Sequence, residues 1–182
     1  MYRSRLGKNL EKVTLDYVSS IDDDVEIAHY DILGSQAHSI MLYENKIITK
    51  KEIKKILKGL ESLKKAKLAN KTDSEDIHEL IESLVIKKIG MDAGGKMHTA
   101  RSRNDQVALD IRMKIRDDIN ITCQCLLDAI KSLVVLAKKH QDTIVPLYTH
   151  LQQAQVGLFS HYLLSYADAL FRDLDRLYVT YG

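Results

Sequence analysis

The side chains best suited to chemistry lie at residues 94–112, in the run GGKMHTARSRNDQVALDIR. The adjacent Gly94 and Gly95 predict a loop with positive φ angles that can approach a ligand closely. A long helix is predicted to follow, and its first turn offers unpaired N–H groups and a partial positive charge. Arg101 and Arg103 add guanidinium groups suited to carboxylates. The segment therefore predicts a binding site for a small polyanion.

A purely structural interpretation of the same segment is also open. Ser102 with Asp105 three residues later is a capping-box pattern, which needs no ligand. In that interpretation the arginines are simply solvated. A single anion site or a plain helix cap is the default for so short a motif.

A second polar group, PLYTHLQQAQ at residues 146–155, shifts the balance toward function. Thr149 and Gln152 form another capping-box pattern, which predicts a helix that begins near Thr149. His150 then falls in the first helical turn, where the helix dipole favours a neutral imidazole. A neutral imidazole at an exposed helix start is able to accept or relay a proton.

Both segments resemble signature regions of the argininosuccinate lyase family, within the fumarase/aspartase superfamily. The string SRNDQ together with THLQ is typical of this member of the superfamily. The likeness extends to residues 17–42, which resemble the family's N-terminal segment with its substrate-binding Ser, and to residues 74–82, which resemble its acidic-His helix start. The chain departs from the family at Val156 and Gly157, where a Pro is usual after the AQ.

The resemblance implies a β-elimination that cleaves argininosuccinate to arginine and fumarate. A base removes a carbon-bound proton beside a carboxylate, and an acid protonates the departing guanidinium nitrogen. Such a site needs donors for carboxylates and two proton-transfer groups. No cofactor is implied, and the sequence offers no clustered ligand set for a metal.

The family's functional residues carry over to matching positions of this sequence. His150 matches the active-site His, which acts either as proton acceptor or as helper to a Ser. The substrate-binding residues correspond to Ser20, Arg103, Asn104 and Thr149, with Ser19 as the alternative register for Ser20. Weaker candidates are His78, His98, Arg101 and Gln152. For His98, an ordering role in the glycine loop is as well supported as substrate contact.

Composition places few other constraints on function. The 182 residues carry 27 Lys plus Arg and 25 Asp plus Glu, which gives a net charge of +2 and no general case for nucleic-acid binding. No apolar stretch is expected to span a bilayer, no secretory signal is recognised, and Cys123 and Cys125 are expected to stay unbridged. We expect a cytoplasmic protein. In this superfamily the sites are shared between subunits of a homotetramer, so the expected partners are further copies and the small-molecule substrate.

The pattern is helical almost throughout, which predicts an all-α fold. Helices are predicted at 24–44, from a Thr49–Glu52 capping box onward, and before Gly90, which is expected in the left-handed αL conformation. In the first of these, the stripe expected to face the core comprises Val25, Ile32, Ala37, Ile40 and Met41. Two long helices follow, at 102–139 and from about Thr149 to the chain end, and the second carries a heptad seam. They need partner helices to cover their apolar stripes.

These elements predict a small N-terminal helical domain at 1–101, followed at 102–182 by the first long helices of a central helical bundle. The family's third signature, a mobile loop that bears Ser and Lys, has no counterpart here. We therefore expect the chain to be an N-terminal piece of a larger enzyme and to be inactive alone. The alternatives are a sister lyase acting on adenylosuccinate, aspartate or fumarate/malate, or a non-catalytic structural or assembly module.

Overall fold

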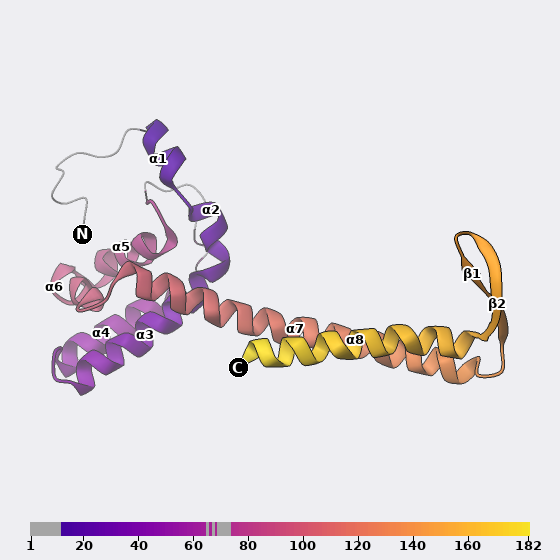
Figure 1. Ribbon diagram of the computed structural model, residues 1–182. Helices are drawn as coiled ribbons and strands as arrows, with labels where there is room; N and C mark the ends of the chain where they lie inside the picture. The colour runs from indigo at the N-terminus through magenta and orange to yellow at the C-terminus, as the bar shows by residue number, and fades with distance from the viewer. Residues whose placement is uncertain (1–11, 65, 67, 69–73) are drawn as a thin grey trace. The chain divides into compact units, whose positions relative to one another are not determined.

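The computed structural model describes residues 12–64, 66, 68 and 74–182. The chain forms two compact units, residues 1–114 and 115–182 (Figure 1). Helices make up most of both, which confirms the predicted all-α class, and the second unit adds one two-stranded sheet.

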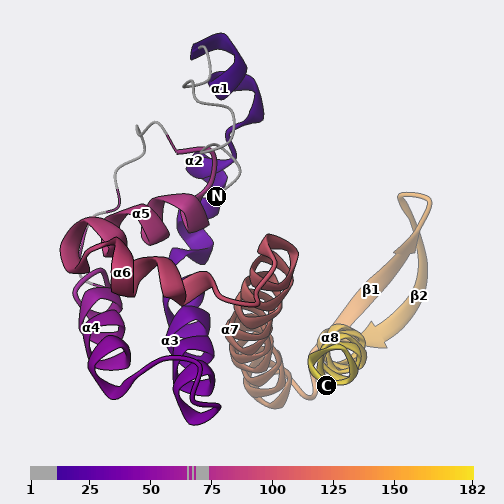
Figure 2. The ribbon, with the colours of Figure 1, turned by 90° about the vertical axis from the view of Figure 1, so that its left-hand side faces the viewer.

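The first unit is built from short and medium helices and the beginning of a long one. They are α1 (Lys12–Val18), α2 (Ile21–Asp24), the 3-10 helix η2 (Val25–Ile27), α3 (Ala28–Glu44), α4 (Lys50–Glu61), α5 (Ile77–Ile89), α6 (Met91–Gly94), the 3-10 helix η3 (Gly95–His98) and the start of α7 (Arg103–Lys139). Helices α3 and α4 lie side by side, and α5 and α6 pack across them (Figure 2).

The apolar side chains of α3, α4 and α5 meet in one core. Its fully buried members include Ile32, Leu42, Ile56, Leu60, Ile77, Ile81 and Val85. Helix α4 begins at the predicted capping box, in which the Thr49 hydroxyl accepts from the Glu52 N–H and the Glu52 carboxylate accepts from the Thr49 N–H. The capping box thus sets where α4 begins, and burial of one face holds the helix against the core.

The buried face of α3 differs from the predicted stripe. Ala37, Ile40 and Met41 are exposed, and the face turned inward consists of Ala28, Asp31, Ile32, Gly34, Ser35, Ser39 and Leu42. The prediction was wrong because it admitted only apolar residues. Three polar side chains lie on the buried face. Asp31 contacts His78 of α5 and Gln106 of α7, Ser35 accepts from Arg101, and Ser39 donates to the Ser35 carbonyl of the same helix.

The glycines near the start of α7 also behave differently from expectation. Gly94 and Gly95 have φ angles of −65° and −64°, so they continue the helical turns of α6 and η3. A Cβ at Gly94 would lie 2.9 Å from Cα of Ile86. The glycine therefore serves close helix packing, and the prediction of a positive φ there was wrong. Gly90 does have a positive φ of 87°, but its ψ of 156° places it outside the αL region expected at the end of α5.

The second unit consists of the rest of α7, the antiparallel strands β1 (Ile144–Thr149) and β2 (Gln152–Leu158), and α8 (Phe159–Tyr181). Helix α8 runs back along α7 (Figures 1 and 2), and the Arg116 guanidinium lies 4.3 Å from the centre of the Tyr181 ring. The predicted heptad seam is confirmed, since its members are buried or half-buried: Leu163, Ala167, Leu170, Leu174, Leu177 and Tyr181.

The segment predicted to open the last helix is instead a β-hairpin. Thr149 and Gln152 are paired across its turn, and the two turn residues, His150 and Leu151, have φ angles of 46° and 64°. The helix begins ten residues later, at Phe159. The capping-box interpretation was wrong because the apolar, β-branched run that leads into the turn favours strand pairing.

Two further expectations concern α7. Cys123 and Cys125 are both free thiols, as predicted. The helix is long and apolar enough to cross a membrane by length and composition, and only 11% of its most apolar window is buried. The expectation that no stretch could meet that criterion was therefore wrong.

Candidate functional site

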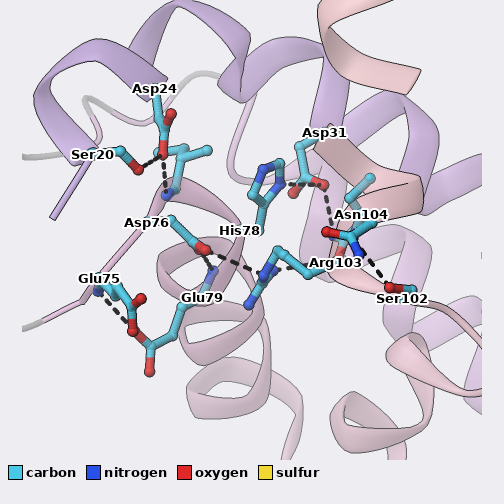
Figure 3. Close-up of polar contacts among 12 residues, drawn as sticks. Ser20, Asp24, Asp31, Glu75, Asp76, His78, Glu79, Ser102, Arg103 and Asn104 are labelled. Atoms are coloured by element: carbon cyan, nitrogen blue, oxygen red, sulfur yellow. Dashed lines mark hydrogen bonds and ion pairs between the residues drawn. The ribbon is translucent and has the colours of Figure 1, made fainter. Parts of the chain in front are cut away.

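Ser20 precedes α2 at its N-cap position and is exposed. Its hydroxyl donates to the Asp24 carboxylate at 2.7 Å, and its N–H donates to the Glu75 carbonyl at 3.0 Å. The same Asp24 oxygen accepts from the N–H of Ile77 at 3.4 Å. The loop that carries Ser20 is thus attached to the start of α5 (Figure 3).

The start of α5 is capped by acidic side chains. Asp76 is the N-cap and accepts from the Glu79 N–H at 2.7 Å, while the Glu79 carboxylate accepts from the Glu75 N–H at 2.8 Å. The other Asp76 oxygen lies 3.2 Å from Nε of Arg103. His78, in the first turn, points inward and is 2% exposed. One short segment therefore supplies both a half-buried carboxylate, that of Asp76, and a buried imidazole.

The first turn of α7 carries Arg103 and Asn104. The Asn104 N–H donates to the Ser102 hydroxyl at 3.2 Å, and the Ser102 N–H donates to the Asp105 carboxylate at 2.9 Å. The Arg103 guanidinium contacts Asp76 and also donates from Nη1 to the Gln106 side-chain oxygen at 3.3 Å. Its side chain is 34% exposed, so it is held in place while still open to solvent.

Arg101, the other predicted clamp, points into the unit. Its side chain is 6% exposed, its Nη1 donates to the Ser35 hydroxyl at 2.9 Å, and its Nη2 lies 4.0 Å from the Asp31 carboxylate. Burial lowers the pKa of Arg101, against the opposing influence of the Asp31 and Asp110 charges. The guanidinium therefore balances buried carboxylates of the protein itself.

Behind the helix start lies a buried polar cluster, which we call the interior cluster: Asp31, His78, Arg101 and Asp110. Nδ1 of His78 lies 3.1 Å from Asp31 and 3.5 Å from Asp110. Both oxygens of Asp110 and one of Asp31 lack a hydrogen-bond partner within the described part of the chain. Unpaired buried oxygens are costly, and a proton, an ordered water or a further positive group in the cluster would satisfy them.

Electrostatics favour a proton on Asp110. Burial, followed by the charge of Asp31, raises the pKa of Asp110 to about 7. For Asp31, burial would raise the pKa, but the hydrogen bond and charge of His78, the hydrogen bond from Gln106 and the charge of Arg101 together lower it. One carboxylate thus stays ionised while its neighbour retains a proton.

Asp31, His78 and Asp110 are also the one group of three potential metal donors among the described residues, with ligand atoms within 4.8 Å of one another. The guanidinium of Arg101 already supplies a positive charge beside them. A divalent cation held by these carboxylates would be repelled by this guanidinium, whereas a proton neutralises one carboxylate without placing a second cation there. The donor set therefore fits a proton better than a metal.

The remaining candidates fall in both units. His98 lies in η3, with its Nε2 2.9 Å from the Gln106 oxygen, in the first unit with Ser20, His78, Arg103 and Asn104. Thr149, His150 and Gln152 lie at the hairpin turn of the second unit, and all three are exposed. The prediction of a helix dipole acting on His150 was wrong, because the residue occupies a β-turn.

Sequence reasoning missed Gln106, Asp31 and Asp110. Gln106 stands inside the SRNDQ string, and Asp110 follows it by four residues, on the same face of α7. Asp31, Ser35 and Ser39 recur every four residues along α3. That helical spacing of polar residues was the available signal, but only a tertiary partner distinguishes a buried polar stripe from a solvated one.

Comparisons with known proteins agree with this architecture. A family described as lyase matches residues 5–181. The argininosuccinate lyase of Nitrosopumilus maritimus (strain SCM1) is 70% identical over 181 residues, which is 100% of this chain and 37% of that protein. The argininosuccinate lyase of Methanocaldococcus jannaschii is 44% identical over 98% of this chain and 38% of its own length. The chain thus spans little more than a third of these relatives.

Solved structures give the same result at the level of the fold. A crystal structure of EDDS lyase in complex with formate has a TM-score of 0.77 and 33% identity, and covers 87% of this chain and 31% of that one. A β-carboxy-cis,cis-muconate cycloisomerase from Acinetobacter calcoaceticus has a TM-score of 0.74 at 18% identity, covering 84% and 37% of the two chains, and shows the shared fold alone.

Proposed function

The chain belongs to the lyase family, and from that premise we propose that the complete protein is an argininosuccinate lyase. The observation that carries this proposal is the 70% identical argininosuccinate lyase, which aligns with all of this chain. The reaction is the β-elimination of argininosuccinate to arginine and fumarate, a step of arginine biosynthesis.

In this proposal the first unit binds the carboxylates of the substrate. Arg103 offers a charge-assisted, bidentate partner at a helix start, where backbone N–H groups also favour an anion. Ser20 and Asn104 add uncharged donors, and both are exposed. His78, His98 and Arg101 stay weaker candidates, because each faces protein groups rather than solvent.

The hairpin of the second unit supplies the proton-transfer group. His150 is the proposed acid or base, with Thr149 as a substrate ligand and Gln152 as a weaker candidate. His150 is exposed in the hairpin turn, which suits a group that must reach a substrate. A second proton-transfer group, and the mobile loop to carry it, are assigned to chain outside this sequence.

We further propose a cytoplasmic homotetramer with sites shared between subunits, without cofactor, metal, nucleic acid or membrane. The exposed apolar side chains of α7 and α8 support this assembly, since partner helices would cover them. In the same proposal the apolar stretch of α7 is covered by helices rather than lipid. The domain boundary near residue 102 likewise stays a proposal.

EDDS is a second candidate substrate, which follows from the similarity to EDDS lyase at 33% identity. The lower identity makes it the weaker candidate. A non-catalytic structural or assembly role is the remaining alternative.

The test is fumarate release, followed by its ultraviolet absorbance, from the complete purified protein. Argininosuccinate, adenylosuccinate, aspartate and EDDS are offered separately. We expect turnover with argininosuccinate at least tenfold above any other substrate. Preference for another substrate would reject the proposed specificity, and no turnover with any would reject the enzymatic role.

A further inference from the structure

Gln106 is a buried side chain at the start of α7 that links three polar groups from separate parts of the first unit. It is 2% exposed. Its Nε2 donates to Asp31 of α3 at 2.9 Å, and its oxygen faces His98 of η3 at 2.9 Å and Arg103 at 3.3 Å.

The chemistry of the partners fixes the orientation of the carboxamide. Arg103 can only donate a hydrogen bond, and the ionised Asp31 can only accept one. The oxygen of Gln106 must therefore face Arg103, and its NH₂ group must face Asp31. His98 then has to donate from Nε2.

The contacts of Arg103 restrict how its guanidinium can turn. Nε lies 3.2 Å from Asp76, and Nη1 donates to Gln106. These contacts engage two of the five N–H donors and leave one N–H on Nη1 and both on Nη2 for a ligand. A guanidinium fixed at two points loses less conformational entropy when it binds a carboxylate.

The far end of the carboxamide rests on a rigid anchor. Asp31 is 0% exposed and is surrounded by His78 at 3.1 Å and Arg101 at 4.0 Å. Three helices, α3, α5 and α7, contribute to this interior cluster together with Arg101 from the preceding loop. Movement of Gln106 would therefore disturb several buried groups at once.

We propose that Gln106 is a positioning residue for the reaction: it transmits the fixed position of Asp31 to the guanidinium of Arg103 and so sets the carboxylate-binding geometry. This inference rests on the proposed function, because it assigns Arg103 to the substrate. Gln106 itself touches no reacting atom.

The first test replaces Gln106→Leu in the complete protein and measures KM and kcat for argininosuccinate. We expect KM to rise about tenfold, the usual effect of losing one hydrogen bond to a charged group, with a smaller change in kcat. Gln36→Leu is the matched control, because Gln36 also donates to a carboxylate, that of Glu61, at 3.0 Å on the surface. It should leave KM unchanged.

A double substitution separates positioning from general destabilisation. If Gln106 acts through Arg103, Gln106→Leu should raise KM no further in an Arg103→Leu background. Independent, multiplicative effects on KM would overturn the proposal.

If the leucine variant does not fold, Gln106→Glu provides the test. This variant keeps the acceptor for Arg103 but places a carboxylate beside that of Asp31. Its KM should therefore approach the wild-type value only at low pH. If the ratio of the Gln106→Glu KM to the wild-type KM does not change with pH, the proposed positioning of Arg103 by Gln106, which we call the relay, is also rejected.

The resonance of the Arg103 Nε–H in nuclear magnetic resonance spectra tests the positioning role of Gln106 separately from the proposed lyase function. A shift or broadening of this signal in the Gln106 variants supports the relay even if no substrate is turned over. An unchanged signal rejects the relay even if the complete protein is an active lyase.

Discussion

The two units of this chain treat their apolar and polar residues in opposite ways. The first unit buries a set of large aliphatic side chains of α3, α4 and α5 in one core and encloses the interior cluster beside it. The second unit leaves much of its apolar surface exposed, with Leu151 at 94%, Tyr178 at 80% and Val156 at 76%. The first unit therefore has its own interior, whereas the second presents an apolar surface of the kind that partner helices cover.

This difference bears on the candidate residues. Arg103 is held by contacts that arise within its own unit, so its geometry is preorganised. His150 lies at the turn of an isolated two-stranded hairpin, a structure that is marginally stable in water without further packing. We infer that the proposed substrate-binding residues of the first unit are already in their binding geometry. The hairpin, in contrast, needs another surface to become rigid.

The strongest test of this contrast is the 182-residue chain alone. We expect no measurable cleavage of argininosuccinate, together with self-association through the exposed apolar side chains of the second unit. Fumarate absorbance and light scattering measure the two outcomes. Clear turnover by a clean monomer would show that the second unit needs no further surface.

The next largest effect is expected from His150→Ala in the complete protein. Loss of a proton-transfer group should lower kcat by about 10²-fold or more. Because His150 has a φ of 46°, the control is His150→Asn, since Asn tolerates this left-handed conformation. Equal losses in both variants assign the effect to the imidazole, and near-wild-type turnover in either removes His150 from the mechanism.

In the first unit, Arg103→Leu should mainly weaken substrate binding. Loss of a bidentate, charge-assisted partner is expected to raise KM on the order of 10- to 100-fold. Arg112→Leu, an exposed arginine on the same helix, serves as the control. Unchanged kinetic constants in the Arg103 variant would show that Arg103 does not bind a carboxylate of the substrate.

The smallest effect concerns the pH dependence of stability in the first unit. The folded-state pKa of Asp110, about 7, lies above its ordinary value of 3.8, so the folded chain holds this proton more tightly than the unfolded one. The stability should therefore fall as pH rises from about 4 to about 7 and level off above that. The lowered pKa of Asp31 acts in the opposite direction, at pH values below about 4.

Asp110→Asn isolates that contribution, because the amide can donate to Asp31 at every pH without carrying charge. Denaturant unfolding at pH 5 and pH 8 should show a free energy of unfolding that depends less on pH than in the wild type.

Zinc titration tests the alternative that the interior cluster binds a metal. Stoichiometric zinc binding abolished by Asp110→Asn would identify a metal rather than a proton in the cluster.

The sequence by itself determined what depends on neighbours along the chain. The Thr49–Glu52 cap, the start of α7 beside Ser102 and the heptad seam of α8 all follow from local hydrogen bonding and periodicity. The position of Arg103 at a helix start follows in the same way. The lyase family could also be recognised from SRNDQ and THLQ, because ordered strings of polar residues are specific.

Only the tertiary structure decided which polar residues are buried and which capping pattern forms. Asp31 and Gln106 are 75 residues apart in the sequence, and burial of either is unfavourable unless the other lies beside it as a hydrogen-bond partner. Thr149 and Gln152 fit a helix cap and a hairpin turn equally well by spacing, and strand pairing from residue 144 to 158 selected the turn. Burial of polar groups and pairing of strands both draw their free energy from partners distant in sequence, which local patterns do not specify.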